Sequence, residues 1–241
     1  MRFLSAAIFL LLFAVPMSAE PIPVLIITGG HEFDEAAFHS MFESMEGIRP
    51  QFASQPHANE LYASSDLEHI QVIVFYDMVQ EISEEQKSAF LALVKKGKGL
   101  VFLHHSLVSY QYWEEFSRIR GGKYILPESL PESDRSSAST YQHDVRFPVR
   151  IIDAKHPVTA GLSDFELTDE VYGNLHLLDS VTPLLHTTHP SSSPIIGWTN
   201  RYGASRIVCL QPGHDRRAYE NPLYRKLVWN AVVWAAGKDE K

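Results

Sequence analysis

Residues 100–106 read LVFLHHS, an apolar run of strand type that ends directly in two histidines. The same arrangement occurs in VLIITGGH at residues 24–31 and in IVCLQPGH at residues 207–214. In an open, mostly parallel α/β sheet, the loops that leave the carboxyl ends of the strands meet at one edge, where ligands bind. The three segments therefore predict an α/β fold with a histidine-rich site at that edge. Chance is the competing explanation, because 12 histidines in 241 residues would place some near strand ends anyway.

The rest of the chain alternates between strand and helix patterns, as such a sheet requires. A capping box at Ser83 and Gln86 begins one helix, and Asn221 with Pro222 begins the last one. No internal repeat and no second domain is visible in the sequence. We therefore expect a single domain over residues 20–241.

The first 19 residues have the layout of a secretory signal peptide. Arg2 is followed by an uncharged apolar stretch and then by a cleavage point with small residues before Glu20. The apolar stretch is too short for a transmembrane helix, and no cysteine near the cleavage point offers a lipid attachment. We expect an exported protein, periplasmic or secreted, with no stable membrane anchor.

The charge balance argues against nucleic acid as a partner. The chain has 21 basic and 29 acidic residues, which gives a formal net charge of −8 at pH 7. An acidic protein lacks the cations that phosphate contacts require, so we expect a small or neutral partner. The single cysteine, Cys209, excludes an intrachain disulfide and lies in an apolar strand pattern. Strand packing is its expected role, and a reactive thiol is the alternative.

Three candidate site residues lie on the turn after residue 103. His104, His105 and Ser106 occupy a predicted strand-to-helix turn, from which side chains project into the crevice and whose helix favours oxyanions. Either histidine alone could instead fix the loop through a backbone hydrogen bond. We expect at least one of the two to act on the ligand.

The other two histidine turns supply further candidates. Gly30 lets a ligand approach the backbone beside His31, although a glycine that serves only the turn is the alternative. His214 follows a rigid turn, and its ordinary pKa near ~6.5 suits proton transfer; the alternative is a histidine in solvent. Asp77 ends another strand pattern. The expected substrate-binding residues are Gly30, His31, Asp77, Ser106, Asp169 and Tyr172.

Asp169 and Glu170 form a carboxylate pair flanked by apolar and aromatic residues, in LTDEVY at residues 167–172. They could hold a metal with the histidines, orient an imidazole or act as a general base; a solvated acidic turn is the alternative. The expected cofactor is a divalent metal, zinc or similar. Its predicted ligands are His31, His105, Glu170 and His214.

Residues 127–144 are rich in Pro, Ser, Glu and Asp and carry few apolar side chains. A loop of that length inside a compact domain is usually functional or mobile. The composition is compatible with a lid over the site and with a solvated insertion.

Taken in order, these motifs resemble the ThuA-like (trehalose utilisation) domains. The resemblance runs from about residue 23 to residue 237. It rests on VLIITGGH, GKGLVFLHHS, HPVTAGL (residues 156–162), DEVY (residues 169–172), Gly213-His214, Asn221-Pro222 and Trp234-Ala235. It implies a class I glutamine amidotransferase-like fold, which is a flavodoxin-like three-layer sandwich with helices on both faces of a mostly parallel sheet.

By this resemblance, residues 100–106 take the place of the amidotransferase nucleophile elbow, and His104 stands about where the cysteine would be. Residues 211–214 likewise take the place of the strand end that carries the triad histidine. Because Cys209 lies in a different strand, no thiolate is available for a thioester. We expect no glutaminase activity.

The resemblance implies a carbohydrate as the ligand, either a glycoside or a 3-keto glycoside. His104, His105, His214 and Glu170 would be the catalytic residues. A partner oxidoreductase would be needed for hydride transfer, because the turn at Gly30 lacks the dinucleotide-binding fingerprint. One rival is a non-catalytic sugar- or metal-binding module. The other is a hydrolase that uses Ser106 with His214 and one carboxylate of the acidic pair.

Overall fold

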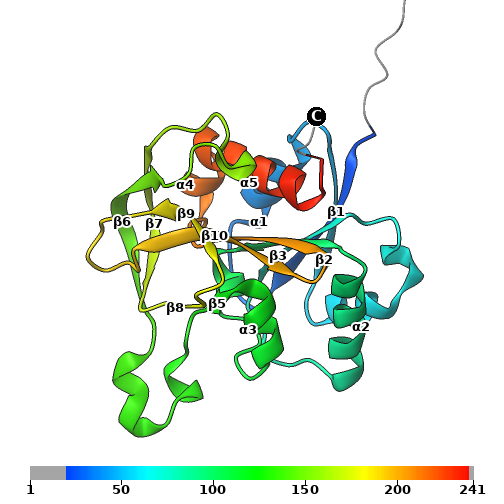
Figure 1. The fold of residues 1–241 in the computed structure, drawn as a ribbon, viewed down its shortest axis with the longest axis horizontal. Helices are drawn as coiled ribbons and strands as arrows, with labels where there is room; N and C mark the ends of the chain where they lie inside the picture. Colours follow the sequence, from blue (N-terminus) through cyan, green and yellow to red (C-terminus); the bar gives the residue numbers. More distant parts are fainter. Residues whose placement is uncertain (1–19, 239–241) are drawn as a thin grey trace, which may run out of the picture.

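The structure, a computed structural model, describes residues 20–238. Within them, a large sheet carries helices on both faces (Figure 1), which confirms the predicted three-layer α/β sandwich. One half of the sheet consists of parallel strands, namely β1 (Ile22–Gly29), β2 (Ile48–Ser54), β3 (Val72–Asp77), β4 (Gly99–Leu103) and β11 (Ser205–Leu210). They lie in the order β2-β1-β3-β4-β11.

The other half of the sheet is antiparallel and continues outward from β11. Its strands are β6 (Thr140–Ile151), β7 (Phe165–Gly173), β9 (Thr182–His186) and β10 (Ile195–Tyr202). They follow in the order β10-β9-β6-β7. Two short strands, β5 (Gly122–Lys123) and β8 (His176–Leu177), form a separate antiparallel ladder.

The helices divide between the two faces of the sheet. α1 (Glu35–Glu43), α4 (Arg216–Tyr219) and α5 (Pro222–Ala235) cover one face, and α2 (Glu84–Lys95) and α3 (Glu114–Arg120) cover the other. Along β1, Val24 and Ile26 belong to the first core while Leu25 and Ile27 belong to the second. A strand that is buried on both faces needs an uninterrupted apolar run, so these runs identified the central strands correctly.

Two helices begin at the capping residues that the sequence predicted. The Ser83 side chain accepts a hydrogen bond from the Gln86 amide, and the Gln86 side chain accepts one from the Ser83 amide, which completes the capping box of α2. Asn221 caps α5 by accepting from two amides of the first turn, with Pro222 at its first position.

Two segments are strands where the sequence suggested loops. Residues 140–144 begin β6, and residues 140–142 pair with β7, so the expected loop over residues 127–144 is wrong in its last part. Asp169 and Glu170 lie within β7 and are 0% and 5% exposed, so a solvated acidic turn is wrong as well. In both segments the pairing with a distant strand overrides the local composition.

Residues 127–137 leave the body of the molecule between β5 and β6 (Figure 1). They form two short 3-10 turns, η4 (Pro127–Ser129) and η5 (Glu132–Ser137), and most of their side chains are exposed. At the base of this segment, Ile125 and Ser139 join through backbone and side-chain hydrogen bonds of 2.9–3.0 Å.

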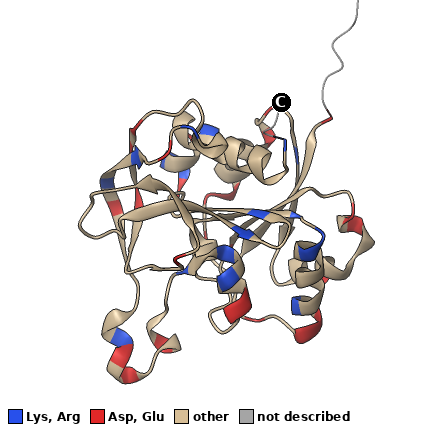
Figure 2. Ribbon diagram, in the orientation of Figure 1, with Lys and Arg blue, Asp and Glu red and all other residues tan. Residues whose placement is uncertain are grey.

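Charged residues are distributed over the helices and loops, with both signs interspersed and the central strands mostly uncharged (Figure 2). Among residues 20–238, no helix has the length and apolar character needed to cross a bilayer. The predicted signal peptide, residues 1–19, lies outside the described residues.

Candidate functional site

Four histidines from three strand ends lie together at the carboxyl edge of the parallel strands. The ring centroid of His105 is 4.1 Å from that of His31, 4.6 Å from that of His104 and 5.4 Å from that of His214. His31 and His214 are 6.2 Å apart. The histidines that follow β1, β4 and β11 therefore lie in one cluster, as the topology of an open parallel sheet predicts.

His104 occupies the turn that follows β4, and its backbone is in the left-handed region with φ = 39°. A non-glycine residue held there is strained, and such strain clusters at functional sites. Its Nδ1 atom is 2.6 Å from the carbonyl oxygen of Gln211. A carbonyl oxygen can only accept, so Nδ1 carries a hydrogen and the neutral ring keeps a lone pair on Nε2.

That Nε2 atom faces three polar groups at once. Glu170 Oε2 lies at 2.7 Å, the Tyr172 hydroxyl at 3.0 Å and His214 Nδ1 at 3.2 Å. The Tyr172 hydroxyl can donate to Nε2, but the carboxylate oxygen cannot. Either a proton or a cation must therefore lie between the histidine and the carboxylate.

The donor set fits a divalent metal. His104 Nε2, Glu170 Oε2 and His214 Nδ1 form a triangle with sides of 2.7, 3.2 and 3.2 Å. Ligand atoms on a tetrahedral zinc with bonds of about 2.0–2.1 Å are roughly 3.3 Å apart. His105 offers a further nitrogen beside this triangle, and all four atoms lie within 4.8 Å of one another, so His105 could complete the ligand set or stay free. The ligands predicted from the sequence included His31, and the structure has His104 in its place.

Electrostatics keep the carboxylate charged. Burial alone would raise the pKa of Glu170, but hydrogen bonds from His104 and His214 lower it well below its ordinary range. Burial alone would lower the pKa of His214, but the hydrogen bond and charge of Glu170 raise it above the ordinary value. The cluster therefore contains one buried anion, the Glu170 carboxylate. The facing nitrogen atoms of His104 and His214 share a single cation or proton with it.

His105 is the exception in this cluster, because within residues 20–238 neither of its ring nitrogens has a hydrogen-bond partner. The residue is 2% exposed. Burial, reinforced by the neighbouring histidines, lowers its pKa well below the ordinary value, so the ring stays neutral with a free lone pair. A buried polar group without a partner is costly. The unprotonated ring nitrogen of His105 is therefore suited to bind a metal or to accept a proton from a substrate.

A cavity of about 220 Å³ opens beside the cluster. Both polar and apolar side chains line it. The polar ones are His31, His105, His143 and Glu170, and the apolar or aromatic ones are Met78, Val108, Tyr124, Leu126, Tyr141 and Tyr172. Burial raises the pKa of Tyr124 to about 12, so its hydroxyl keeps its proton.

Asp169 differs from its neighbour Glu170, because it does not line the cavity. Its carboxylate accepts hydrogen bonds from the backbone amides of Gly213, at 2.6 Å, and His214, at 3.0 Å. Burial raises its pKa although these bonds oppose the shift. Asp169 therefore fixes the turn that carries His214.

Tyrosine hydroxyls hold the carbonyl side of the same turn. The Tyr76 hydroxyl lies 2.9 Å from the Gly213 carbonyl oxygen, and the Tyr219 hydroxyl lies 2.9 Å from the His214 carbonyl oxygen. The two hydroxyls are 2.5 Å apart, so one donates to the other and the second donates to a carbonyl of the turn. The turn after β11 thus has partners for both its amides and its carbonyls, which limits the positions that the His214 ring can take.

Of the predicted site residues, Gly30, Asp77 and Ser106 also lie outside the described cavity lining, as do Asp169, His104 and His214. A Cβ atom on Gly30, where φ is 82°, would lie 2.2 Å from the Met78 carbonyl oxygen, so this glycine is required for packing. Asp77 is fully buried, and Gln55 donates to its carboxylate at 3.0 Å. Ser106 is also buried and donates to the Leu103 carbonyl. Among the described contacts, its hydroxyl has no hydrogen bond to a histidine, so the geometry gives no support to a serine nucleophile.

His143 is the residue that the sequence interpretation missed. Its Nδ1 atom lies 3.4 Å from Glu170 Oε1, and its ring centroid is 4.9 Å from that of His214. The β6–β7 register shifts between Gln142 and Val145, which leaves two residues of β6 opposite Glu170. Such a bulge redirects side chains. Tyr141 and His143 alternate as side chains on one face of a strand do. The polar composition of the segment led instead to the prediction of a loop.

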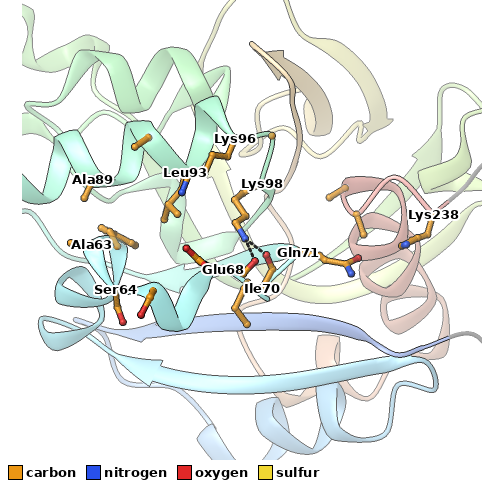
Figure 3. Close-up of a pocket in the computed structure, with 16 residues that line it drawn as sticks. Ala63, Ser64, Glu68, Ile70, Gln71, Ala89, Leu93, Lys96, Lys98 and Lys238 are labelled. Carbon is orange, nitrogen blue, oxygen red and sulfur yellow. Dashed lines mark hydrogen bonds between the residues drawn. The ribbon is translucent and has the colours of Figure 1, made fainter.

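A larger cavity, of about 860 Å³, lies at the amino ends of β3 and β4 (Figure 3). Its most buried cation, Lys98, already donates to the carbonyls of Leu67 at 2.7 Å, Glu68 at 3.0 Å and Ile70. Its lining contains no histidine among the described residues. The histidine cluster, which faces the smaller cavity, is therefore the candidate site.

Comparison with protein families agrees with the motifs. The family model for ThuA, described as trehalose utilisation, matches residues 23–235. No curated protein matches the sequence.

Solved structures show the same fold at low sequence identity. A ThuA-like protein from Parabacteroides merdae is 21% identical with a TM-score of 0.75, and the match covers 92% of both chains. A ThuA-like protein from Bacteroides uniformis is 18% identical with a TM-score of 0.69, over 94% of this chain and 96% of that one. A β-galactosidase from Bacillus circulans is 9% identical with a TM-score of 0.53, over 90% of this chain but only 31% of that one.

Proposed function

The chain belongs to the ThuA, or trehalose utilisation, family, and we propose that it processes a carbohydrate with a divalent metal at the histidine cluster. The carbohydrate class follows from the family, and a glycoside or a 3-keto glycoside is the proposed substrate. A cavity lined by both polar and aromatic side chains suits a sugar ring, which has hydroxyls at its edge and C–H groups on its faces.

The observation that carries the metal proposal is the triangle of His104, Glu170 and His214. Three ligand atoms within 3.2 Å of one another, of which one is a buried carboxylate, need a shared positive charge. The hydrogen bond from His104 Nδ1 to the Gln211 carbonyl fixes the ring tautomer, as outer partners do at metal sites. Three protein ligands and an open position are typical of catalytic zinc.

Each residue of this chain has a distinct task in the proposal. His104, Glu170 and His214 would hold the metal, which supplies polarisation of a sugar hydroxyl or carbonyl oxygen. His105 faces the cavity with an unprotonated nitrogen and would accept a proton from the polarised sugar. His31 packs on His105 at 4.1 Å and would limit the access of water to that nitrogen.

Elemental analysis of the purified protein, combined with a screen of glycosides and their 3-keto derivatives, tests this function. We expect about one equivalent of a divalent metal, and turnover that is lost on chelation and restored by adding the metal back. Binding of metal or sugar without turnover of any glycoside would instead indicate a non-catalytic binding module. A protein that retains no added metal at micromolar concentration would contradict the metal proposal.

We also propose that residues 1–19 direct export and that an oxidoreductase supplies any keto sugar. Amino-terminal sequencing of the protein recovered from the periplasm or medium tests the first part, with Glu20 as the expected first residue. Recovery of the uncleaved chain from the cytoplasm would contradict it.

A further inference from the structure

The candidate cavity is smaller than a typical ligand pocket. At about 220 Å³ it lies below the roughly 300–1,000 Å³ that encloses a drug-sized ligand. Among the described residues that line it there is no lysine or arginine. The cavity therefore has room for about one uncharged ring, and any larger ligand must extend out of it.

An aromatic side chain stands where such a ligand would emerge. Tyr141 lines the cavity but is 62% exposed. Its ring centroid is 5.3 Å from that of His143, in an edge-to-face arrangement. A large aromatic side chain that is exposed to solvent at the mouth of a polar cavity is typical of a ligand-binding site. The other strongly exposed tyrosine, Tyr112 at 72%, is absent from the described lining of this cavity.

The strand register places Tyr141 next to a residue of the cluster. In the β6–β7 ladder, Tyr141 lies directly opposite Tyr172. Residues opposite each other on an antiparallel pair project from the same face, with Cβ atoms about 5 Å apart. The Tyr172 hydroxyl in turn reaches His104 Nε2 at 3.0 Å. Tyr141 is therefore the outer member of a tyrosine pair whose inner member contacts a proposed metal ligand.

We infer that Tyr141 is a specificity-determining residue, which stacks on a second, uncharged ring of the substrate outside the cavity. This inference rests on the proposed function. The first ring enters the cavity beside His105, and the second lies against the exposed face of Tyr141. The absence of a described cationic side chain in the lining favours a neutral second ring over a phosphate or carboxylate.

Binding measurements on zinc-loaded protein test the inference with matched one-ring and two-ring probes. The probes are methyl α- and β-D-glucopyranoside, compared with trehalose and cellobiose. Aromatic stacking should make a two-ring probe bind wild type about three- to tenfold more tightly than its one-ring counterpart. Tyr141→Ala should abolish this difference by weakening the two-ring probe more than the one-ring probe, and Tyr141→Phe should retain it.

Tyr112→Ala is the matched control, because it removes an exposed tyrosine away from the cavity lining and should leave both affinities unchanged. If Tyr141→Ala keeps the two-ring preference, or weakens both probes equally, Tyr141 has no selective role. If wild type binds no probe of either kind while it binds zinc, the carbohydrate part of the proposed function fails, and this inference fails with it.

Discussion

The Asp169 carboxylate accepts a 3.0 Å hydrogen bond from the backbone amide of His214, while the next residue, Glu170, lies 3.2 Å from the ring of that same histidine. Successive side chains of a strand point to opposite faces, so β7 holds His214 from two sides. Asp169 fixes the backbone of the turn, and Glu170 shares a cation or proton with the ring. Two adjacent carboxylates thus have separable roles.

Substitution of the two carboxylates should separate stability from metal binding. Glu170→Gln removes the charge at the cluster but keeps the shape, so metal affinity should fall by at least tenfold while the thermal midpoint of the metal-free protein changes little. Asp169→Asn leaves one backbone amide without an acceptor, which should lower stability by about 1–3 kcal/mol. Zinc titration and thermal unfolding measure the two effects.

Glu166→Gln is a suitable control, because Glu166 lies on the same strand in an exposed ion pair with Arg146. It should change neither property. Full metal affinity in Glu170→Gln would remove Glu170 from the ligand set, and unchanged stability in Asp169→Asn would show that Asp169 does not hold the turn.

The two adjacent histidines should also differ. Asparagine tolerates the left-handed backbone that His104 adopts, so His104→Asn should fold but lose metal, because it removes a ligand whose ring is fixed by the Gln211 carbonyl. His105→Asn removes the unpartnered nitrogen and should keep most of the metal, but lose turnover by about 10²-fold or more, the scale of a general base. Metal analysis and turnover of the best glycoside distinguish the two variants. Equal metal loss in both would make His105 a ligand instead of a base.

Much of the fold could be predicted because its signals are local. The apolar runs before His31, His104 and His214 identify strands that are buried on both faces, and the capping residues of α2 and α5 act within one turn. The convergence of the histidines then follows from the general topology of parallel sheets. It needs no knowledge of side-chain packing.

The remaining features depend on strand pairing, which local sequence does not determine. His143 and Tyr141 reach the site because β6 pairs with β7 and contains a bulge opposite Glu170. Which carboxylate of the acidic pair faces the cluster is likewise a matter of register, since a shift of one residue exchanges the faces. The place of His104 in the ligand set depends on ring orientation, which the Gln211 carbonyl fixes.

Asp77 should make stability depend on pH. Burial raises the pKa of this carboxyl from 3.8 to about 6. The folded protein therefore binds the proton more tightly than the unfolded chain, and the stabilisation is complete below about pH 4 and is lost as the pH rises through 6. At pH 8 the loss corresponds to about 3 kcal/mol. Asp77→Asn, which keeps an acceptor for Gln55, should therefore become progressively more stable than wild type from pH 4 to pH 8.

Urea unfolding at pH 4, 6 and 8 measures this difference, with Asp179→Asn as an exposed-carboxylate control. A stability difference between Asp77→Asn and wild type that stays constant with pH would show that Asp77 is ionised normally in the fold.

Arg217 joins the bulge in β6 to the turn that follows β11. Its Nη2 atom donates to Asp144 at 2.6 Å, and its Nε atom donates to Asp215 at 3.0 Å. Asp144 follows His143, and Asp215 follows His214. One guanidinium thus spans the outer side of the cluster, in a fork geometry that lysine cannot reproduce.

Loss of this bridge should affect metal release more than stability. Arg217 is 45% and Asp144 73% exposed, and exposed ion pairs contribute only about 0–1 kcal/mol. Arg217→Met should therefore shift the thermal midpoint little but speed zinc release to a chelator several-fold. Asp144→Asn should do the same, and the double variant should be no faster than either single one, because both remove one bridge. Arg146→Met, which breaks an ion pair elsewhere on the β6–β7 hairpin, should leave release unchanged. Additive acceleration in the double variant would mean that the two residues act separately and that no bridge controls the opening of the cluster.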